Sequence, residues 1–251
     1  MLVLGIETTG AKGSCAVMET EGRAILERRM ITGRMSHLKD LTADIKDMLD
    51  SLGKAPADLG AVAVSVGPGS FTGIRIGVST ARALGQALDI PCAAVPTLEL
   101  FRNIKGCAGG TAVILNARRG QVYGAVFGAD GEDVLPPGPY MLNDVLDAAE
   151  RLRAQAGLGT PVPVFFGDGI DAYGDMPEYA DRLALFGIAE PEDRYQTADM
   201  VCLKAAEMTE RGMTVGYSEV MPEYMRLAEA EQRLNDGSLR RMQEKKWRNL
   251  L

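Results

Sequence analysis

The stretch "GAVAVSVGPGSFTGIRIG", residues 60–77, joins a run of alanines and valines to a segment with helical spacing through a glycine-rich turn. The apolar run is typical of a strand buried on both faces, and a helix is expected from about 72 to 88. Glycine-rich turns that open a helix can bind phosphate, because the first N–H groups of a helix lack partners. Neither GxxxxGK(S/T) nor GxGxxG occurs here, so the spacing favours a tight strand-to-helix turn with Ser70 or Thr72 as the cap.

Around this stretch the first half of the chain alternates between strand and helix patterns. Apolar runs separated by turn-forming residues predict strands, and apolar residues at helical spacing predict an amphipathic helix. The expected elements are strands at 2–7, 14–19 and 23–31, a helix at 36–52, a strand at 90–95 and a helix that opens at Thr97.

The second half begins in the same way, with "TAVILNARRGQVYGAVFG" at 111–128 predicting two strands around a turn. A third strand within 131–142, a helix at 142–155, a buried strand at 161–167 and a helix at 198–211 complete the pattern. This repetition predicts an α/β, two-lobed actin-like (ASKHA, ribonuclease-H-like) fold in which each lobe opens with three strands. The expected division is a first lobe at 1–105, a smaller lobe at 106–235, with helix 198–211 as a candidate to return to the first lobe, and a basic tail at 236–251.

Composition sets the expected environment of the protein. The chain of 251 residues is 46% hydrophobic, and no apolar run approaches the roughly 20 residues that a membrane span needs. Four widely spaced cysteines without CxxC spacing predict reduced thiols and a cytoplasmic location. The net charge of −7 makes the surface as a whole a poor partner for nucleic acid.

The sequence contains one histidine, His37, at the expected start of a helix. A metal site built on two histidines one helical turn apart is therefore excluded, and a Ser–His–Asp or Cys–His centre would depend on His37 alone. We predict no catalytic residue and no metal ligand in this chain.

Three stretches, "LVLGIETTGAKGSCAVME", "VSVGPGSFTGIRIGVSTARALGQAL" with "IPCAAVPTLE", and "NARRGQVYGAVF", together resemble the TsaB (YeaZ) family. The resemblance covers most of residues 1–127, and "MPEYMRLAEAE" near the end matches the closing segment of that family. It implies a non-catalytic subunit that is required for threonylcarbamoyladenosine modification of tRNA beside the anticodon. It further implies pairing with a catalytic TsaD subunit, recruitment of the P-loop ATPase TsaE, ATP and metal on those partners, contact with tRNA through the complex, and a homodimer when alone.

Three residues depart from the family pattern. Family members mostly show Asp and Ser in the turn after the first strand, where this chain has Glu7 and Thr9, and usually Asp where it has Asn116. Glu7, Thr8 and Thr9 could contact a magnesium–nucleotide, or they could form an ordinary β-turn in which a threonine hydroxyl bonds to the backbone.

Small residues recur every four positions at Gly73, Gly77, Ala81 and Gly85, along one face of the expected helix. Each glycine costs roughly 0.8–1 kcal/mol of helix propensity relative to alanine, so close packing is expected in compensation. The neighbour is either this chain's own sheet or a partner helix, and the family resemblance favours the partner. The predicted partner-binding residues are Leu38, Leu41, Ile45, Met48, Gly73, Gly77, Val78, Ala81, Arg82 and Gly85.

Basic residues suggest further contacts. Arg118 and Arg119 at the hairpin turn are either solvated or in contact with a partner subunit or RNA, because guanidinium groups suit carboxylate and phosphate. The basic tail at 236–251 is either a charged helix end or a phosphate-binding segment.

Two other classes of function remain open. The chain could be a stand-alone actin-like ATPase or metallo-endopeptidase, which the single histidine disfavours. It could also be a self-associating interaction protein that uses helices 36–52 and 72–88 for homodimers only.

Overall fold

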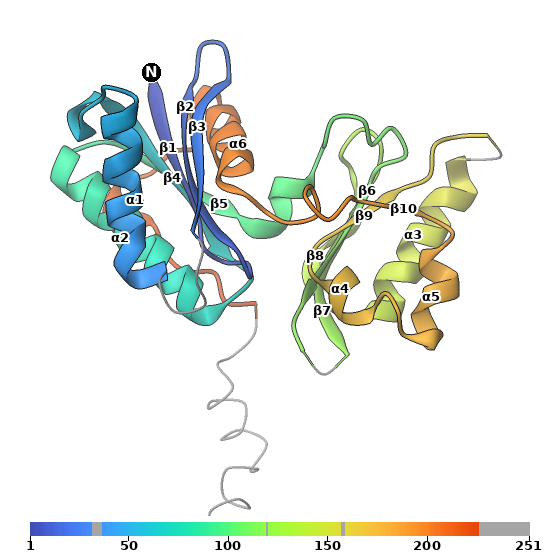
Figure 1. Cartoon of the computed structure of the whole chain (residues 1–251). Coiled ribbons are helices and arrows are strands. Elements are labelled where there is room, and N and C mark those ends of the chain that lie inside the picture. Colours follow the sequence, from blue (N-terminus) through green and yellow to red (C-terminus); the bar gives the residue numbers. More distant parts are fainter. Residues whose placement is uncertain (32–36, 119, 157–158, 226–251) are drawn as a thin grey trace, which may run out of the picture.

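The computed structural model describes residues 1–31, 37–118, 120–156 and 159–225 (Figure 1). Arg119 and the basic tail lie outside the described residues, and so do the side chains of His37 and Leu38. Within the described part, none of the helices has the length and apolar character needed to span a membrane.

The first lobe consists of β1 (Leu2–Glu7), β2 (Gly13–Glu19), β3 (Ala24–Ile31), α1 (His37–Ser51), η1 (Pro56–Asp58), β4 (Leu59–Gly67), α2 (Phe71–Leu88) and β5 (Cys92–Pro96). Its sheet has the order β3-β2-β1-β4-β5. The first three strands are antiparallel, whereas β4 runs parallel to β1 and β5 runs parallel to β4. Helices α1 and α2 lie together on one face of this sheet (Figure 1).

The second lobe consists of β6 (Thr111–Asn116), β7 (Gln121–Phe127), β8 (Asp133–Met141), α3 (Leu142–Ala156), β9 (Val164–Phe166), α4 (Gly169–Tyr173), α5 (Pro177–Leu183) and β10 (Gly187–Ile188). Its sheet order, β10-β9-β6-β7-β8, repeats the first topology, with three antiparallel strands followed by two parallel ones. The predicted two-lobed architecture, each lobe opening with three strands, is confirmed.

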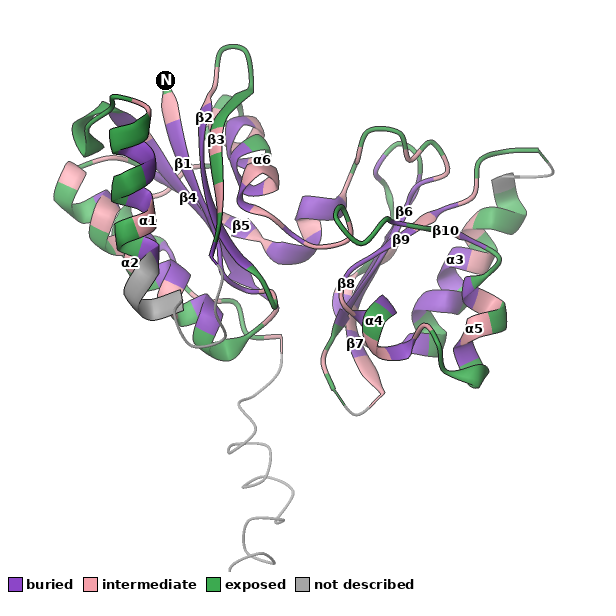
Figure 2. Cartoon of the chain, viewed as in Figure 1, coloured by how far each residue is buried: buried purple, intermediate pink, exposed green. Residues whose placement is uncertain are grey.

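Helix α6 (Ala198–Glu210), the helix expected at 198–211, returns from the second lobe and packs against β1 and β2, on the face opposite α1 and α2. Apolar side chains fill three cores: between the first sheet and α1 and α2, between the first sheet, α6 and the second sheet, and between the second sheet and its own helices. Figure 2 shows both sheets largely buried and much of the outward sides of α1 and α2 exposed. The lobes are therefore joined by a shared apolar core.

The helix expected to open at Thr97 is instead a five-residue 3-10 turn, η2 (Thr97–Phe101). Leu98 and Phe101 are fully buried between the lobes, and Asn103 soon after has a φ of 61°. Arg102, which follows η2 directly, already has an extended backbone, so the helix ends there, and the left-handed Asn103 then turns the chain toward the second lobe.

Candidate functional site

The glycine-rich turn between β4 and α2 is a packed connection held by the turn that follows β1. Ser70 N donates to Thr9 O at 2.7 Å, and Ser70 Oγ accepts from Gly73 N at 3.3 Å, so Ser70 is the cap of α2. Gly67 and Gly69 have φ values of 123° and 155°, which residues with side chains rarely adopt. Because the N–H groups of Ser70 and Gly73 are bonded within the chain, the geometry is that of a strand-to-helix turn capped by Ser70.

Glu7 ends β1 and is completely buried. Its Oε1 accepts from Thr9 N at 2.5 Å, from Thr9 Oγ1 at 2.7 Å and from Gly10 N at 3.2 Å. Burial raises the pKa of the Glu7 carboxyl, while the hydrogen bonds from Thr9 and Gly10 oppose the rise. Among the described residues, however, neither Glu7 Oε2 nor Ser65 Oγ completes a hydrogen bond of ordinary geometry. The carboxyl therefore organises the turn from inside the core.

The neighbouring threonines are buried as well. Thr8 Oγ1 donates to Gly73 O at 2.7 Å, and Thr9 Oγ1 lies 3.4 Å from both Thr97 Oγ1 and Gln196 Nε2. Thr8 and Thr9 are each 2% exposed, so a nucleotide phosphate would reach them only if these contacts opened. The β-turn alternative matches this geometry. The sequence analysis did not predict the contact of Gln196 with Thr9. The two residues are 187 positions apart, and no local pattern around Gln196 indicates the contact.

We expect Glu7→Gln to be more stable than the wild type at pH 8 and equally stable in acid. Because the folded-state pKa of Glu7 lies above its ordinary value of 4.5, folding favours the protonated form. That stabilisation is fully present below pH 4.5 and is lost as the pH rises through the folded-state pKa. A glutamine stays neutral, keeps the acceptor oxygen and offers Ser65 a donor.

Thermal unfolding of Glu7→Gln across this pH range checks the expectation, with Glu21→Gln as an exposed control that should show no such trend. A Glu7→Gln variant that is less stable than the wild type at pH 8 would mean that the site needs the carboxylate charge.

The hairpin between β6 and β7 is organised by Asn116. Asn116 Oδ1 accepts from Arg118 N at 2.8 Å and from Tyr173 OH at 3.0 Å, and Asn116 N donates to Asp168 Oδ1 at 2.8 Å. Burial raises the pKa of the Asp168 carboxyl. A neutral amide at 116 therefore accepts both bonds without placing a second carboxylate beside Asp168. Arg118 itself is exposed, with a φ of 66°.

The small-residue face of α2 packs against this chain's own sheet, which corrects the predicted partner surface. A Cβ at Gly77 would lie 2.5 Å from Thr8 Oγ1 and 3.1 Å from Val64 Cγ2, and one at Gly85 would lie 2.6 Å from Cys92 Sγ. The glycines allow α2 to sit close to the strands, which is the compensation for their low helix propensity.

The remaining residues of the predicted interface are mostly internal too. Leu41, Ile45, Met48, Val78 and Ala81 are no more than 5% exposed and belong to the core under α1 and α2. A helix on a sheet must bury its apolar stripe, and here that stripe is used within the chain. Of the described residues in the predicted set, only Arg82 is partly exposed, so a partner would meet the opposite faces of the two helices.

A closing strap, residues 215–225, flanks α2 and was not anticipated as a structural element. Val215 pairs with Cys92, Glu223 N donates to Val66 O at 2.7 Å, and Val220 is fully buried. The available signal was the apolar and aromatic content of "VGYSEVMPEYM", which is unusual for a free terminus.

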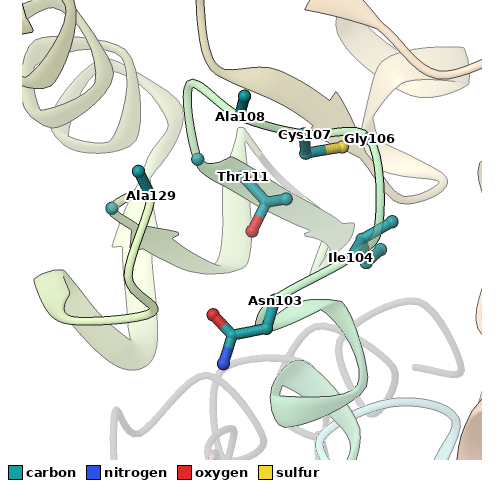
Figure 3. A pocket seen from close by; sticks show the side chains of 9 residues that line it. Asn103, Ile104, Gly106, Cys107, Ala108, Thr111 and Ala129 are labelled. Carbon is teal, nitrogen blue, oxygen red and sulfur yellow. The ribbon is translucent and has the colours of Figure 1, made fainter.

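A pocket of about 370 Å³ lies where the chain passes from η2 to β6 (Figure 3). Asn103, Cys107 and Thr111 bring polar side chains to it, and the Thr111 hydroxyl is already bonded to Phe101 O at 2.7 Å. Burial raises the pKa of the Cys107 thiol, which disfavours the reactive thiolate. Among the described residues, no group of three or more His, Cys, Asp or Glu side chains is placed to hold a metal ion.

Two lobes with the same five-stranded topology, joined by a shared core, define an actin-like protein with ribonuclease-H-like lobes. A family model described as TsaD, tRNA N6-adenosine threonylcarbamoyltransferase, matches residues 32–182. The chain is 30% identical over 238 residues to the tRNA threonylcarbamoyladenosine biosynthesis protein TsaB of Bacillus subtilis, covering 92% of this chain and 96% of that one.

The TsaB protein of Escherichia coli is 26% identical over 238 residues, covering 90% of this chain and 95% of that one. The solved structure of YeaZ from Pseudomonas aeruginosa superposes with a TM-score of 0.66 at 24% identity, covering 89% and 99% of the two chains. The chain belongs to the TsaB (YeaZ) family, which places it in tRNA threonylcarbamoyladenosine biosynthesis.

Proposed function

We propose that this chain is a non-catalytic subunit that binds a TsaD-like catalytic subunit and supports its modification of tRNA. The observation that carries the proposal is the match to a curated TsaB protein along 92% of the chain. The family model described as TsaD also matches this chain, so the two subunits would share a fold, and related folds can pair through corresponding surfaces. A TsaE-like ATPase joins the pair, and ATP and metal reside on the partner subunits.

We propose the absence of catalysis from the types of residue that the chain contains and from the contacts that they make. It has one histidine, and its buried Glu7 turn is committed to internal hydrogen bonds. A purified chain that hydrolyses ATP above background in metal-replete buffer, and loses that activity on Glu7→Ala, would overturn this part of the proposal.

The partner surface is proposed to be the outward side of α1 and α2. On α2, Ala83 is exposed whereas Ala81, two residues earlier, is fully buried. We expect Ala83→Trp to keep the stability of the wild type and to weaken binding of the TsaD-like subunit by about tenfold or more. Ala81→Leu should instead lose roughly 1–3 kcal/mol of stability through overpacking.

Reconstituted tRNA modification, with and without this chain, tests the function, and calorimetric binding with thermal unfolding tests the two variants. Modification that proceeds equally well without the chain would overturn the proposed role. Unchanged binding by a stable Ala83→Trp variant would place the partner elsewhere. Self-association without binding of the TsaD-like subunit would favour the homodimer alternative.

A further inference from the structure

A groove of about 350 Å³ runs between α2 and the closing strap. Its apolar lining comes from Val78, Ala83 and Pro222, and its polar lining includes Arg75, Arg82 and Gln86. Both arginines project from α2 seven residues apart, which is about 10.5 Å along a helix. The groove thus presents two cations along an apolar strip.

Arg75 is held in place without being neutralised. Its guanidinium lies 3.9 Å from the centre of the Phe71 ring, and its Nε donates to Tyr224 OH at 3.0 Å. The rings of Phe71 and Tyr224 stack 4.7 Å apart. Among the described residues its two Nη groups have no hydrogen bond or ion pair. Folding has therefore already restricted the side chain of Arg75, so that binding a partner would cost little further side-chain entropy.

Arg82 is similarly unneutralised within the described part of the chain. Its polar contact there is the weak one from Nη1 to Met221 Sδ at 3.8 Å. Elsewhere in the described chain, Arg102 and Arg182 each pair with two carboxylates. Helix α2 itself contains no Asp or Glu, and no carboxylate of another described element pairs with Arg75 or Arg82.

Among the described residues, neither Glu219 nor Glu223 of the strap pairs with these arginines. Glu219 accepts from Gly216 N at 3.2 Å. Burial and the negative charge of Glu99 raise the pKa of Glu223. The groove consequently keeps a local positive charge on a chain of net charge −7.

We propose that this groove receives the carboxylate side chains of an acidic helix of the partner subunit. The proposal rests on the proposed function and deepens it, since it names the chemistry by which the partner is selected. Two arginines two turns apart match carboxylates two turns apart on a helix packed alongside, and the apolar strip accommodates the side chains between them. A single phosphate is too small to span both guanidinium groups.

An RNA backbone is a poorer match to this surface. The neighbouring helix α1 carries Asp44, Asp47 and Asp50, of which Asp50 is paired with Lys46 and Asp47 is exposed. Asp44 and Asp47 would repel a phosphate chain laid across the two helices. A partner protein can place acidic residues over α2 and basic or apolar residues over α1.

The test measures binding of the TsaD-like subunit by the full chain and by Arg82→Glu and Arg75→Gln/Arg82→Gln, at low and high salt. We expect Arg82→Glu to weaken binding by about tenfold or more, and the double variant to lose most of the salt dependence of the wild type. Arg151→Glu, an equal charge change at an exposed position of α3 in the other lobe, is the matched control and should bind as the wild type does. Thermal unfolding verifies that each variant is folded.

Each possible result of this test either supports or overturns the proposal. Unchanged binding by folded arginine variants, while Ala83→Trp still blocks binding, overturns the charge proposal and leaves the proposed function standing. An equal loss with Arg151→Glu shows that net charge rather than the groove is responsible, and also overturns it. Arginine variants that keep the subunit but lose tRNA assign the groove to RNA instead. A wild-type chain that does not bind the TsaD-like subunit overturns both proposals.

Discussion

Gly73→Ala is expected to lower the free energy of unfolding by about 3 kcal/mol or more. A Cβ at this position would lie 1.8 Å from the carbonyl oxygen of Thr8 and 2.9 Å from its carbonyl carbon. Both atoms are backbone, so no side-chain rotation relieves the overlap. The end of β1 and the start of α2 must separate, which also strains the bond from Thr8 Oγ1 to Gly73 O and the neighbouring Glu7 turn.

Urea unfolding of Gly73→Ala measures this effect, with Gly22→Ala as the control, because the nearest atom to a Cβ at Gly22 is Glu19 Oε2 at 4.0 Å. At an open position in a helix, alanine would gain about 0.8–1 kcal/mol over glycine. A Gly73→Ala variant that is as stable as the wild type would therefore show that α2 does not approach β1 as closely as described.

Gly5→Ala should have the second-largest effect, about 2–3 kcal/mol, by forcing α6 away from the first sheet. A Cβ at Gly5 would lie 2.5 Å from the carbonyl oxygen of Ala198 and 2.6 Å from Cys202 Sγ. Because α6 follows the second lobe in the chain and packs on the sheet of the first, its displacement should also loosen the core that the lobes share. We expect faster proteolysis in the segment that precedes α6.

Gly60→Ala is the matched control in a strand of the same sheet. Its Cβ would meet only the flexible Met1 side chain at under 3 Å, with contacts of 2.3 Å to Cγ and 2.7 Å to Sδ, and that side chain can move aside. Equal stability losses at Gly5 and Gly60 would contradict the specific role of α6, and would point to strand propensity as the cause.

The correction at α2 shows how far sequence reasoning reached. Helical spacing placed Gly73, Gly77, Ala81 and Gly85 on one face, and they do share one face. Helical periodicity identifies the face of a helix that carries small residues, but it does not identify the segment that packs against that face. The closeness of Thr8 and Val64 to those glycines comes from the parallel pairing of β1 with β4, which brings distant segments together.

The candidate site divides in the same way. The likeness of the two halves predicted the fold class, and the three stretches that resemble the TsaB (YeaZ) family predicted the family; both are properties of the chain as written. The burial of Glu7, the contact of Gln196 with Thr9 and the strap that fixes Arg75 through Tyr224 were not foreseeable.

The sequence by itself thus determined most of the strands and long helices, though not the short elements α4, α5 and β10, how the two lobes repeat, and which chemistry the side chains can supply. Tertiary structure alone decided which helix faces are internal and where, within the described residues, Arg75 and Arg82 have no carboxylate partner. The physical reason is that local propensity and periodicity depend on neighbours within a few residues along the chain. Burial, charge pairing and close backbone approach depend on residues such as Phe71 and Tyr224, which only the complete fold brings together.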